Sequence, residues 1–263
     1  MKRIYRIDHR GTPRHVIEEH GEWRLLEGDL FDGYEAGDAI PGTGHAVLAP
    51  ILPSKIAAIG LNYKDHAAEQ NKPLPEEPLM FLKPSTAVIG PGDTIVLPEG
   101  AGRIDHEAEV GVVIGKRASH VPEDRAHEYV LGLTCVNDVT ARELQTKDVQ
   151  YTRAKSFDTF APLGPCIAVG IDYRTPEGVQ VEGWVNGERR QSSSTNQLIF
   201  PIDTLVAFVS RVMTLLPGDV ISTGTPAGIG SLKSGDRVTI KVAGVGELSN
   251  PVGQAISLRG ARS

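Results

Sequence analysis

Two glutamates, Glu107 and Glu109, stand one residue apart just before the apolar run Val112-Val113-Ile114. The run predicts a buried strand, and because side chains alternate between the faces of a strand, both carboxylates should point the same way. Like charges side by side repel, and the protein interior strengthens that repulsion. A hard divalent cation held between the two groups by oxygen ligands would convert the repulsion into binding. The alternative is a solvated strand face that carries two ordinary glutamates.

A third carboxylate, Asp138, lies just past another predicted strand, Leu131–Val136. There it can converge on the glutamate pair as a third ligand from a neighbouring strand end. Three carboxylates without an accompanying cysteine suit Mg²⁺ or Mn²⁺ better than Zn²⁺. The helical zinc-protease motif is absent, because Val110 stands where a second histidine would have to follow His106-Glu107.

The length and composition of the chain narrow the class of protein. Its 263 residues suffice for one sizeable domain or a main domain with a small appendage, and its formal net charge of -6 argues against a nucleic-acid surface. Cys135 and Cys166 lie in apolar contexts and form no metal-type cluster, which predicts buried, reduced thiols. No apolar run has the length of a signal-peptide core or a membrane span. We therefore expect a cytoplasmic protein that binds neither nucleic acid nor membranes.

Strand-like segments outnumber helical ones and do not alternate regularly with them, so the sequence predicts a mixed β fold with some α rather than a doubly wound sheet. Residues 1–50 are predicted to form a small β-rich N-terminal domain, connected through prolines to a catalytic domain at 51–263. Helices are expected at 66–69, 122–129, 141–150 and 203–215. Strands of the larger domain are expected at 56–60, 79–82, 87–89, 94–97, 110–114, 131–136, 166–169, 180–186, 219–222, 238–242 and 246–250.

His66 and Glu69 stand three residues apart in a short helical segment that Pro73 and Pro75 end. At this spacing two helical side chains can touch. A carboxylate on one imidazole nitrogen fixes the tautomer and strengthens the ring as a general base. The alternative is a surface histidine paired with a surface glutamate.

Several further polar residues are candidates for binding a substrate. Lys83 and Lys155 each adjoin apolar or aromatic residues, an unusual setting for a fully solvated lysine. Arg142 and Gln145 lie three residues apart on a predicted helix just after Asp138, where they can bind a carboxylate. Taken singly, each of these cations is more simply explained by a surface salt bridge.

The glycine-rich loop Ser222–Gly230 follows a predicted strand. It lacks the Lys-Ser/Thr ending of a phosphate loop, and Pro226 interrupts any dinucleotide-binding fingerprint. Its backbone N–H groups and the Thr225 hydroxyl can still hold a small anion.

In their order along the chain, these motifs resemble the fumarylacetoacetate hydrolase family, in particular its bacterial acylpyruvase and 2-hydroxyhepta-2,4-diene-1,7-dioate isomerase-like branch. The resemblance spans roughly residues 56–250, and residues 1–50 match only as a short variable N-terminal part. No single motif is decisive, but the ordered set is specific. The segments that carry it are Gly60–Tyr63 with His66 and Glu69, Met80–Pro84, Asp105–Gly111, Asn137–Arg142, Lys155–Asp158, Leu216–Ile221 and Thr223–Gly228.

The resemblance implies a β-sandwich roll, a homodimer, and a Mg²⁺ or Mn²⁺ site formed by Glu107, Glu109 and Asp138. It also implies that His66 and Glu69 act as an acid–base pair on a mobile lid helix. The remaining residues that it places at the substrate are Lys155, as a catalytic group, and Lys83, Arg142, Gln145 and Thr225.

Members of this family act on 2-oxo acids or their enols. A 2-oxo carboxylate can chelate a divalent cation, which then stabilises the enolate formed when the next C–C bond breaks or a proton leaves. With His66 activating water, the leading hypothesis is hydrolysis of an acylpyruvate-type diketo acid in aromatic or organic acid catabolism. The alternatives are isomerisation of 2-hydroxyhepta-2,4-diene-1,7-dioate or 5-carboxymethyl-2-hydroxymuconate, oxaloacetate decarboxylation, and a non-catalytic member of the fold that binds a small molecule.

Overall fold

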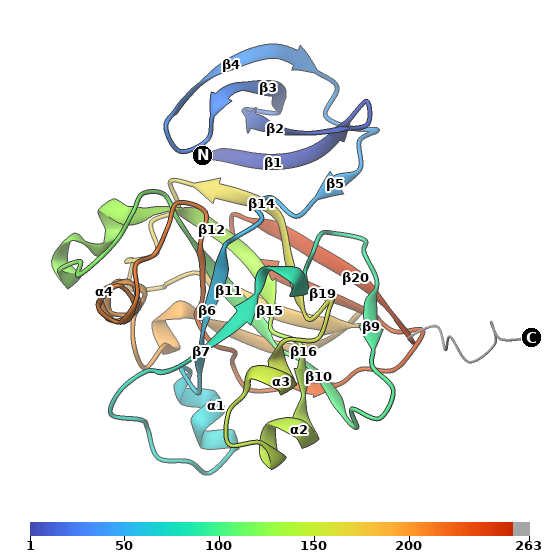
Figure 1. Cartoon of the computed structure of the whole chain (residues 1–263), viewed down its shortest axis with the longest axis vertical. Helices are drawn as coiled ribbons and strands as arrows, with labels where there is room; N and C mark the ends of the chain where they lie inside the picture. The colour runs from blue at the N-terminus through green and yellow to red at the C-terminus, as the bar shows by residue number, and fades with distance from the viewer. Residues whose placement is uncertain (255–263) are drawn as a thin grey trace, which may run out of the picture.

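The computed structural model describes residues 1–254, and most of its regular structure is β-strand (Figure 1). The largest sheet has 12 strands, ten of which follow one another in a single path. In spatial order these are β4 (Gly33–Ile40), β3 (Glu22–Asp29), β2 (Thr12–Glu19), β1 (Lys2–His9), β14 (Ala161–Val169), β12 (Val130–Asn137), β11 (Ala108–Ile114), β17 (Val220–Ser222), β6 (Lys55–Gly60) and β7 (Leu79–Pro84). Two short strands lie off the path, where β5 (Val47–Leu48) pairs with β1 and β8 (Val88–Ile89) pairs with β14.

A second sheet of five strands packs against β11, β12 and β14 of the first. Its strands are, in order, β16 (Glu188–Ser194), β15 (Gln180–Val185), β19 (Arg237–Val242), β20 (Gly246–Gln254) and β9 (Ile95–Leu97). The main core cluster includes buried side chains from both sheets, among them Val112, Leu133, Val181, Ile240 and Leu248. The predicted mixed, mostly β fold is therefore confirmed. A small third sheet holds β13 (Thr140–Ala141), β10 (Ile104–His106) and β18 (Gly230–Ser231).

The helices are short and differ from the expected ones at their ends. α1 (Lys64–Glu69), α2 (Arg142–Lys147) and α3 (Thr152–Lys155) lie at the end of the molecule opposite β1–β4 (Figure 1). α4 (Ile202–Val212) begins directly after Pro201, so the residue expected to start it, Asp203, lies in its first turn and accepts a hydrogen bond from the Tyr173 hydroxyl at 2.7 Å. The helix expected at 122–129 is a 3₁₀ helix, η2 (Glu123–Tyr129), and two further 3₁₀ turns are η1 (Ser85–Ala87) and η3 (Thr195–Gln197). None of the described helices combines the length and apolar character needed to cross a membrane.

The first four strands continue the large sheet through a pairing of β1 with β14, in which Lys2 lies opposite Val169. Arg3 also donates a hydrogen bond to the carbonyl of Gly244 at 3.1 Å. The division of the chain at residue 50 into two domains stays a prediction, and residues 255–263 of the predicted larger domain lie outside the described residues.

The register between β11 and β12 positions the candidate site. Ala108 pairs with Asn137, so Glu107 and Asp138 meet at neighbouring strand ends, where the Asp138 N–H donates to the Glu107 carbonyl at 2.9 Å. Gly111 allows the strands to pack this closely, because a Cβ there would lie 2.6 Å from the Val136 side chain.

Candidate active site

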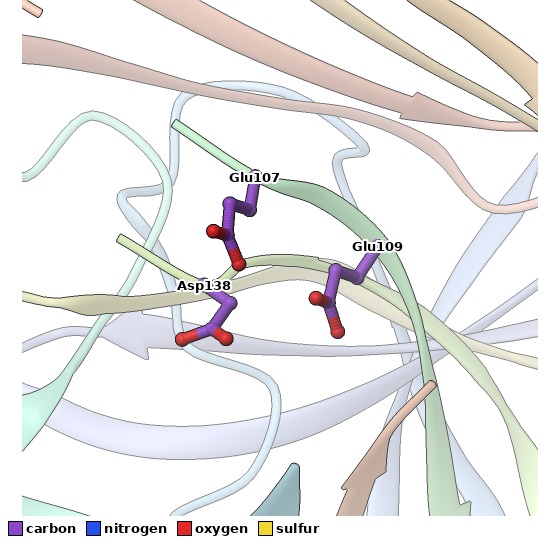
Figure 2. Close-up of side chains that lie close together, drawn as sticks. All are labelled: Glu107, Glu109 and Asp138. Atoms are coloured by element: carbon purple, nitrogen blue, oxygen red, sulfur yellow. The ribbon is translucent and has the colours of Figure 1, made fainter. Parts of the chain in front are cut away.

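Glu107, Glu109 and Asp138 converge on one point (Figure 2), and one oxygen from each lies within 4.8 Å of the other two. All three residues are buried, with relative exposures of 5%, 1% and 1%. The two glutamates do not share one continuous strand as predicted. Glu107 lies between β10 and β11, because β10 pairs with β13 and β18 whereas β11 pairs with β12 and β17. Their carboxylates nevertheless point to the same side (Figure 2).

Two of the three carboxylates have cationic partners. The Lys155 ammonium lies 2.7 Å from Glu107 Oε2 and 2.5 Å from Asp138 Oδ2. Arg142 Nη2 donates to Glu107 Oε1 at 2.5 Å, and Lys83 Nζ donates to Asp138 Oδ1 at 2.6 Å. Burial alone would raise the pKa of Glu107, but Lys155 and Arg142 outweigh burial and hold that pKa well below its usual range.

Glu109 has no cationic partner within residues 1–254. Its Oε2 accepts hydrogen bonds from the Ser222 hydroxyl at 2.5 Å and from the Gly224 N–H at 2.9 Å. Burial, together with repulsion from Asp138 and Glu107, raises the pKa of Glu109 to about 8. A buried carboxylate without a counter-ion is strongly stabilised by a bound cation. Because the converging donors are all carboxylate oxygens, the residues fit Mg²⁺ or Mn²⁺.

The histidine–glutamate pair predicted from spacing is in contact on α1. His66 Nδ1 lies 3.0 Å from Glu69 Oε2, and Gln70 Nε2 lies 2.8 Å from His66 Nε2. These partners assign the proton to Nδ1, which donates to the carboxylate, and leave Nε2 as the acceptor of the amide N–H. His66 is only 5% exposed, whereas the Glu69 side chain is 42% exposed, so the imidazole is buried and its carboxylate partner reaches solvent.

A cavity of about 240 Å³ brings these groups together. Its wall contains the three carboxylates and, of the other candidate residues, His66, Lys155, Arg142, Gln145 and Thr225. Lys83 is fully buried behind Asp138 and is not among the lining residues. Its ammonium donates to Asp138 and to the Lys155 carbonyl at 2.5 Å, so in this arrangement Lys83 supports the carboxylate cluster rather than facing a substrate.

The residues expected to bind a substrate carboxylate differ in how many hydrogen-bond donors are not already engaged within the protein. Arg142 uses Nε for Asp105 at 2.9 Å, Nη1 for Gln145 at 2.5 Å and Nη2 for Glu107, which leaves two of its five N–H groups. The Gln145 amide group also remains available, since only its oxygen is used by Arg142. The Thr225 hydroxyl donates to the Ala108 carbonyl at 3.0 Å, so it offers a substrate an acceptor oxygen rather than a proton.

Gln191 is the residue that sequence reasoning missed most clearly. Its side chain is 1% exposed, and its oxygen accepts hydrogen bonds from the Ala108 N–H at 2.9 Å and from His106 Nδ1 at 3.0 Å. Its amide nitrogen donates to Thr225 Oγ1 at 2.7 Å and to the Pro226 carbonyl at 2.8 Å. Because Gln191 follows two arginines in the polar strand β16, no apolar pattern marks it as buried.

The backbone of the glycine-rich loop binds two carboxyl groups of the protein itself rather than an external anion. The Gly224 N–H donates to Glu109, and the Gly228 N–H donates to Glu69 Oε1 at 3.0 Å. Both glycines have positive φ angles, +99° and +94°, which other residues rarely adopt. One loop therefore orients a carboxylate of the candidate metal site and the carboxylate of the histidine pair.

The chain belongs to the fumarylacetoacetate hydrolase family. Residues 55–253 match the family described as fumarylacetoacetate (FAA) hydrolase C-terminal. An uncharacterized protein of Archaeoglobus fulgidus is 56% identical over 227 residues, which cover 86% of this chain and 88% of that protein. A 5-carboxymethyl-2-hydroxymuconate delta-isomerase from Mycobacterium smegmatis has a similar structure, with a TM-score of 0.88 and 44% identity over 96% of this chain and 100% of that one.

Two other relatives carry names that bear on the chemistry. The mitochondrial oxaloacetate tautomerase fahd2 of Xenopus laevis is 42% identical over 217 residues, covering 79% of this chain and 68% of that protein. A maleylpyruvate hydrolase from Sphingobium, solved with manganese(II) and pyruvate, has a TM-score of 0.80 and 29% identity over 97% of this chain and 100% of that one. The named relatives of this chain therefore include an isomerase, a tautomerase and a hydrolase.

Proposed function

We propose that the protein is a divalent-metal-dependent enzyme that acts on 2-oxo acids or their enols, and that its leading reaction is hydrolysis of an acylpyruvate-type diketo acid. The observation that carries this proposal is the shared cavity: the carboxylate cluster, Lys155 and the oriented base His66 all line it. A manganese(II)-bound relative with pyruvate in its structure supports the same chemistry.

A divalent cation bound by Glu107, Glu109 and Asp138 would supply Lewis-acid polarisation of the 2-oxo group. Lys155 uses two of its three N–H donors on Glu107 and Asp138, and its third can stabilise the developing oxyanion. The unused N–H groups of Arg142 and Gln145 bind the substrate carboxylate.

His66 supplies the base for hydrolysis. Glu69 keeps the proton on Nδ1, so Nε2 can take a proton from a water molecule once the Gln70 amide moves aside. That water attacks the acyl carbonyl, the C–C bond breaks, and the bonding electrons pass to the pyruvate enolate. Protonation of the enolate carbon completes the release of a carboxylate and pyruvate.

Proton transfer alone, as in an isomerase or tautomerase, is the second candidate. The relatives with those names are 44% and 42% identical to this chain, whereas the maleylpyruvate hydrolase is 29% identical. Such a reaction needs the enolate-stabilising groups and a proton carrier, but no water attack.

A substrate panel with Mg²⁺ or Mn²⁺ separates these reactions. Acetylpyruvate, fumarylpyruvate, oxaloacetate and 5-carboxymethyl-2-hydroxymuconate are assayed by ultraviolet absorbance, with pyruvate measured through lactate dehydrogenase. Hydrolysis of an acylpyruvate yields pyruvate, whereas isomerisation changes absorbance without it. Absence of turnover for the whole panel with both metals would contradict the enzyme proposal and favour the small-molecule-binding alternative. Homodimer formation, a cytoplasmic location and a role in aromatic or organic acid catabolism stay predictions.

A further inference from the structure

Lys72 is a cavity-lining cation that the proposed reaction does not use. It follows α1, and its backbone N–H donates to the Ala67 carbonyl at 3.0 Å, which fixes the start of its side chain. Its ammonium group forms no hydrogen bond or ion pair with any residue from 1 to 254. By contrast, Arg142 and Lys155 are both held by carboxylates.

The charged groups in the wall of the cavity differ in how deeply they are buried. Its carboxylates and Lys155 are at most 5% exposed, whereas Lys72 is exposed, so Lys72 lies on the solvent side. Much of the remaining wall is apolar, formed by Ile59, Leu61, Leu79, Phe81 and Tyr151. This arrangement suits a ligand with a chelating 2-oxo acid at the inner end, an apolar or unsaturated middle, and an anion at the outer end.

We propose that Lys72 binds a distal carboxylate of the substrate, so that the protein prefers 2-oxo dicarboxylates over 2-oxo acids that end in an apolar group. The inference rests on the proposed function, because it assumes that the 2-oxo acid group occupies the inner end of the cavity. An ammonium group presents three donors and a full charge. Among residues 1–254, the residues that line the cavity include no carboxylate besides the three of the metal cluster to pair with it.

Binding of two unreactive ligands of equal length tests the proposal. 2-Oxoadipate ends in a carboxylate and 2-oxohexanoate in a methyl group, and their dissociation constants are measured by calorimetry with Mg²⁺ present. The wild-type protein should bind 2-oxoadipate about tenfold more tightly, a typical effect of one charged hydrogen bond. Lys72→Met should bring the two affinities close together, and Lys72→Arg should retain most of the preference.

Lys64→Met is the matched control, because Lys64 is an exposed lysine of α1 outside the cavity wall. It should preserve the wild-type preference. If Lys72→Met keeps the full preference, or if the wild type has none, the inference is overturned while turnover of acetylpyruvate still supports the proposed function. If neither ligand binds and no panel substrate reacts, the inference and the proposed function fail together.

Discussion

Glu69 accepts a hydrogen bond from the backbone N–H of Gly228 at 3.0 Å, across a sequence separation of 159 residues. The other oxygen of the same carboxylate contacts His66. Because Gly224 of the same loop donates to Glu109, the loop couples the position of the base to that of the carboxylate cluster. The His66–Glu69 pair is thus fixed from outside its own helix as well as within it.

Replacing Gly228 with alanine should break this link. Its φ is +94°, and a Cβ would lie 2.1 Å from the Arg190 carbonyl oxygen, so the loop must shift. We expect Gly228→Ala to lower the free energy of unfolding by about 2–4 kcal/mol and to reduce hydrolysis. Gly187 is the control, since its φ is +81° but nothing lies within 4 Å of a Cβ there, and Gly187→Ala should lower stability by only about 1–2 kcal/mol. Equal losses in urea titrations of the two variants would contradict the steric account.

His66→Ala should separate the reactions available to the site. Acylpyruvate hydrolysis should fall by about 10²–10⁴-fold, since the general base is lost. Decarboxylation of oxaloacetate requires no activated water and should persist with Mg²⁺. His127→Ala, at an exposed position outside the cavity wall, should leave both rates unchanged. Hydrolysis by His66→Ala at the wild-type rate would show that another group is the base.

The carboxylate cluster was predictable because apolar runs locate β11 and β12, and the strand ends then bring Glu107 and Asp138 together. The His66–Glu69 contact was predictable because a single helical turn determines it. The four-residue α3 escaped prediction because it is too short to show helical periodicity.

Contacts between distant segments were not predictable in the same way. Gln191 contacts Ala108 across 83 residues, and nothing local distinguishes it from its polar neighbours in β16. The Thr225 hydroxyl was expected to donate to an anion, but it donates instead to the Ala108 carbonyl, 117 residues away in sequence. The spacing of residues in the sequence determines which side chains share one face of a helix or strand. It does not determine which residues of a distant segment contact that face.

His15 should make stability fall at acidic pH. Burial lowers the pKa of its imidazole below the usual 6.5, although its hydrogen bond to the Pro50 carbonyl opposes the shift. Below about pH 6.5 the folded protein therefore binds fewer protons at His15 than the unfolded chain does. Protonation then favours the unfolded chain, so the free energy of unfolding decreases as the pH falls below 6.5. Between about pH 7.5 and pH 5, the wild type should lose more unfolding free energy than His15→Gln. His127→Gln, at an exposed position, should follow the wild type. Parallel curves for wild type and His15→Gln would exclude this role.

Calorimetric titration with Mn²⁺ tests the metal site most directly. The metal-free wild type should bind about one ion per chain at the carboxylate cluster. Glu109→Gln retains an oxygen that can accept from Ser222 and Gly224 but loses the charge, so its affinity for Mn²⁺ should fall by about 100-fold or more. Glu35→Gln, on the exposed face of β4, should bind Mn²⁺ as the wild type does. Undiminished binding by Glu109→Gln, or a wild type that binds no Mn²⁺ and keeps full activity after exhaustive chelation, would contradict the account.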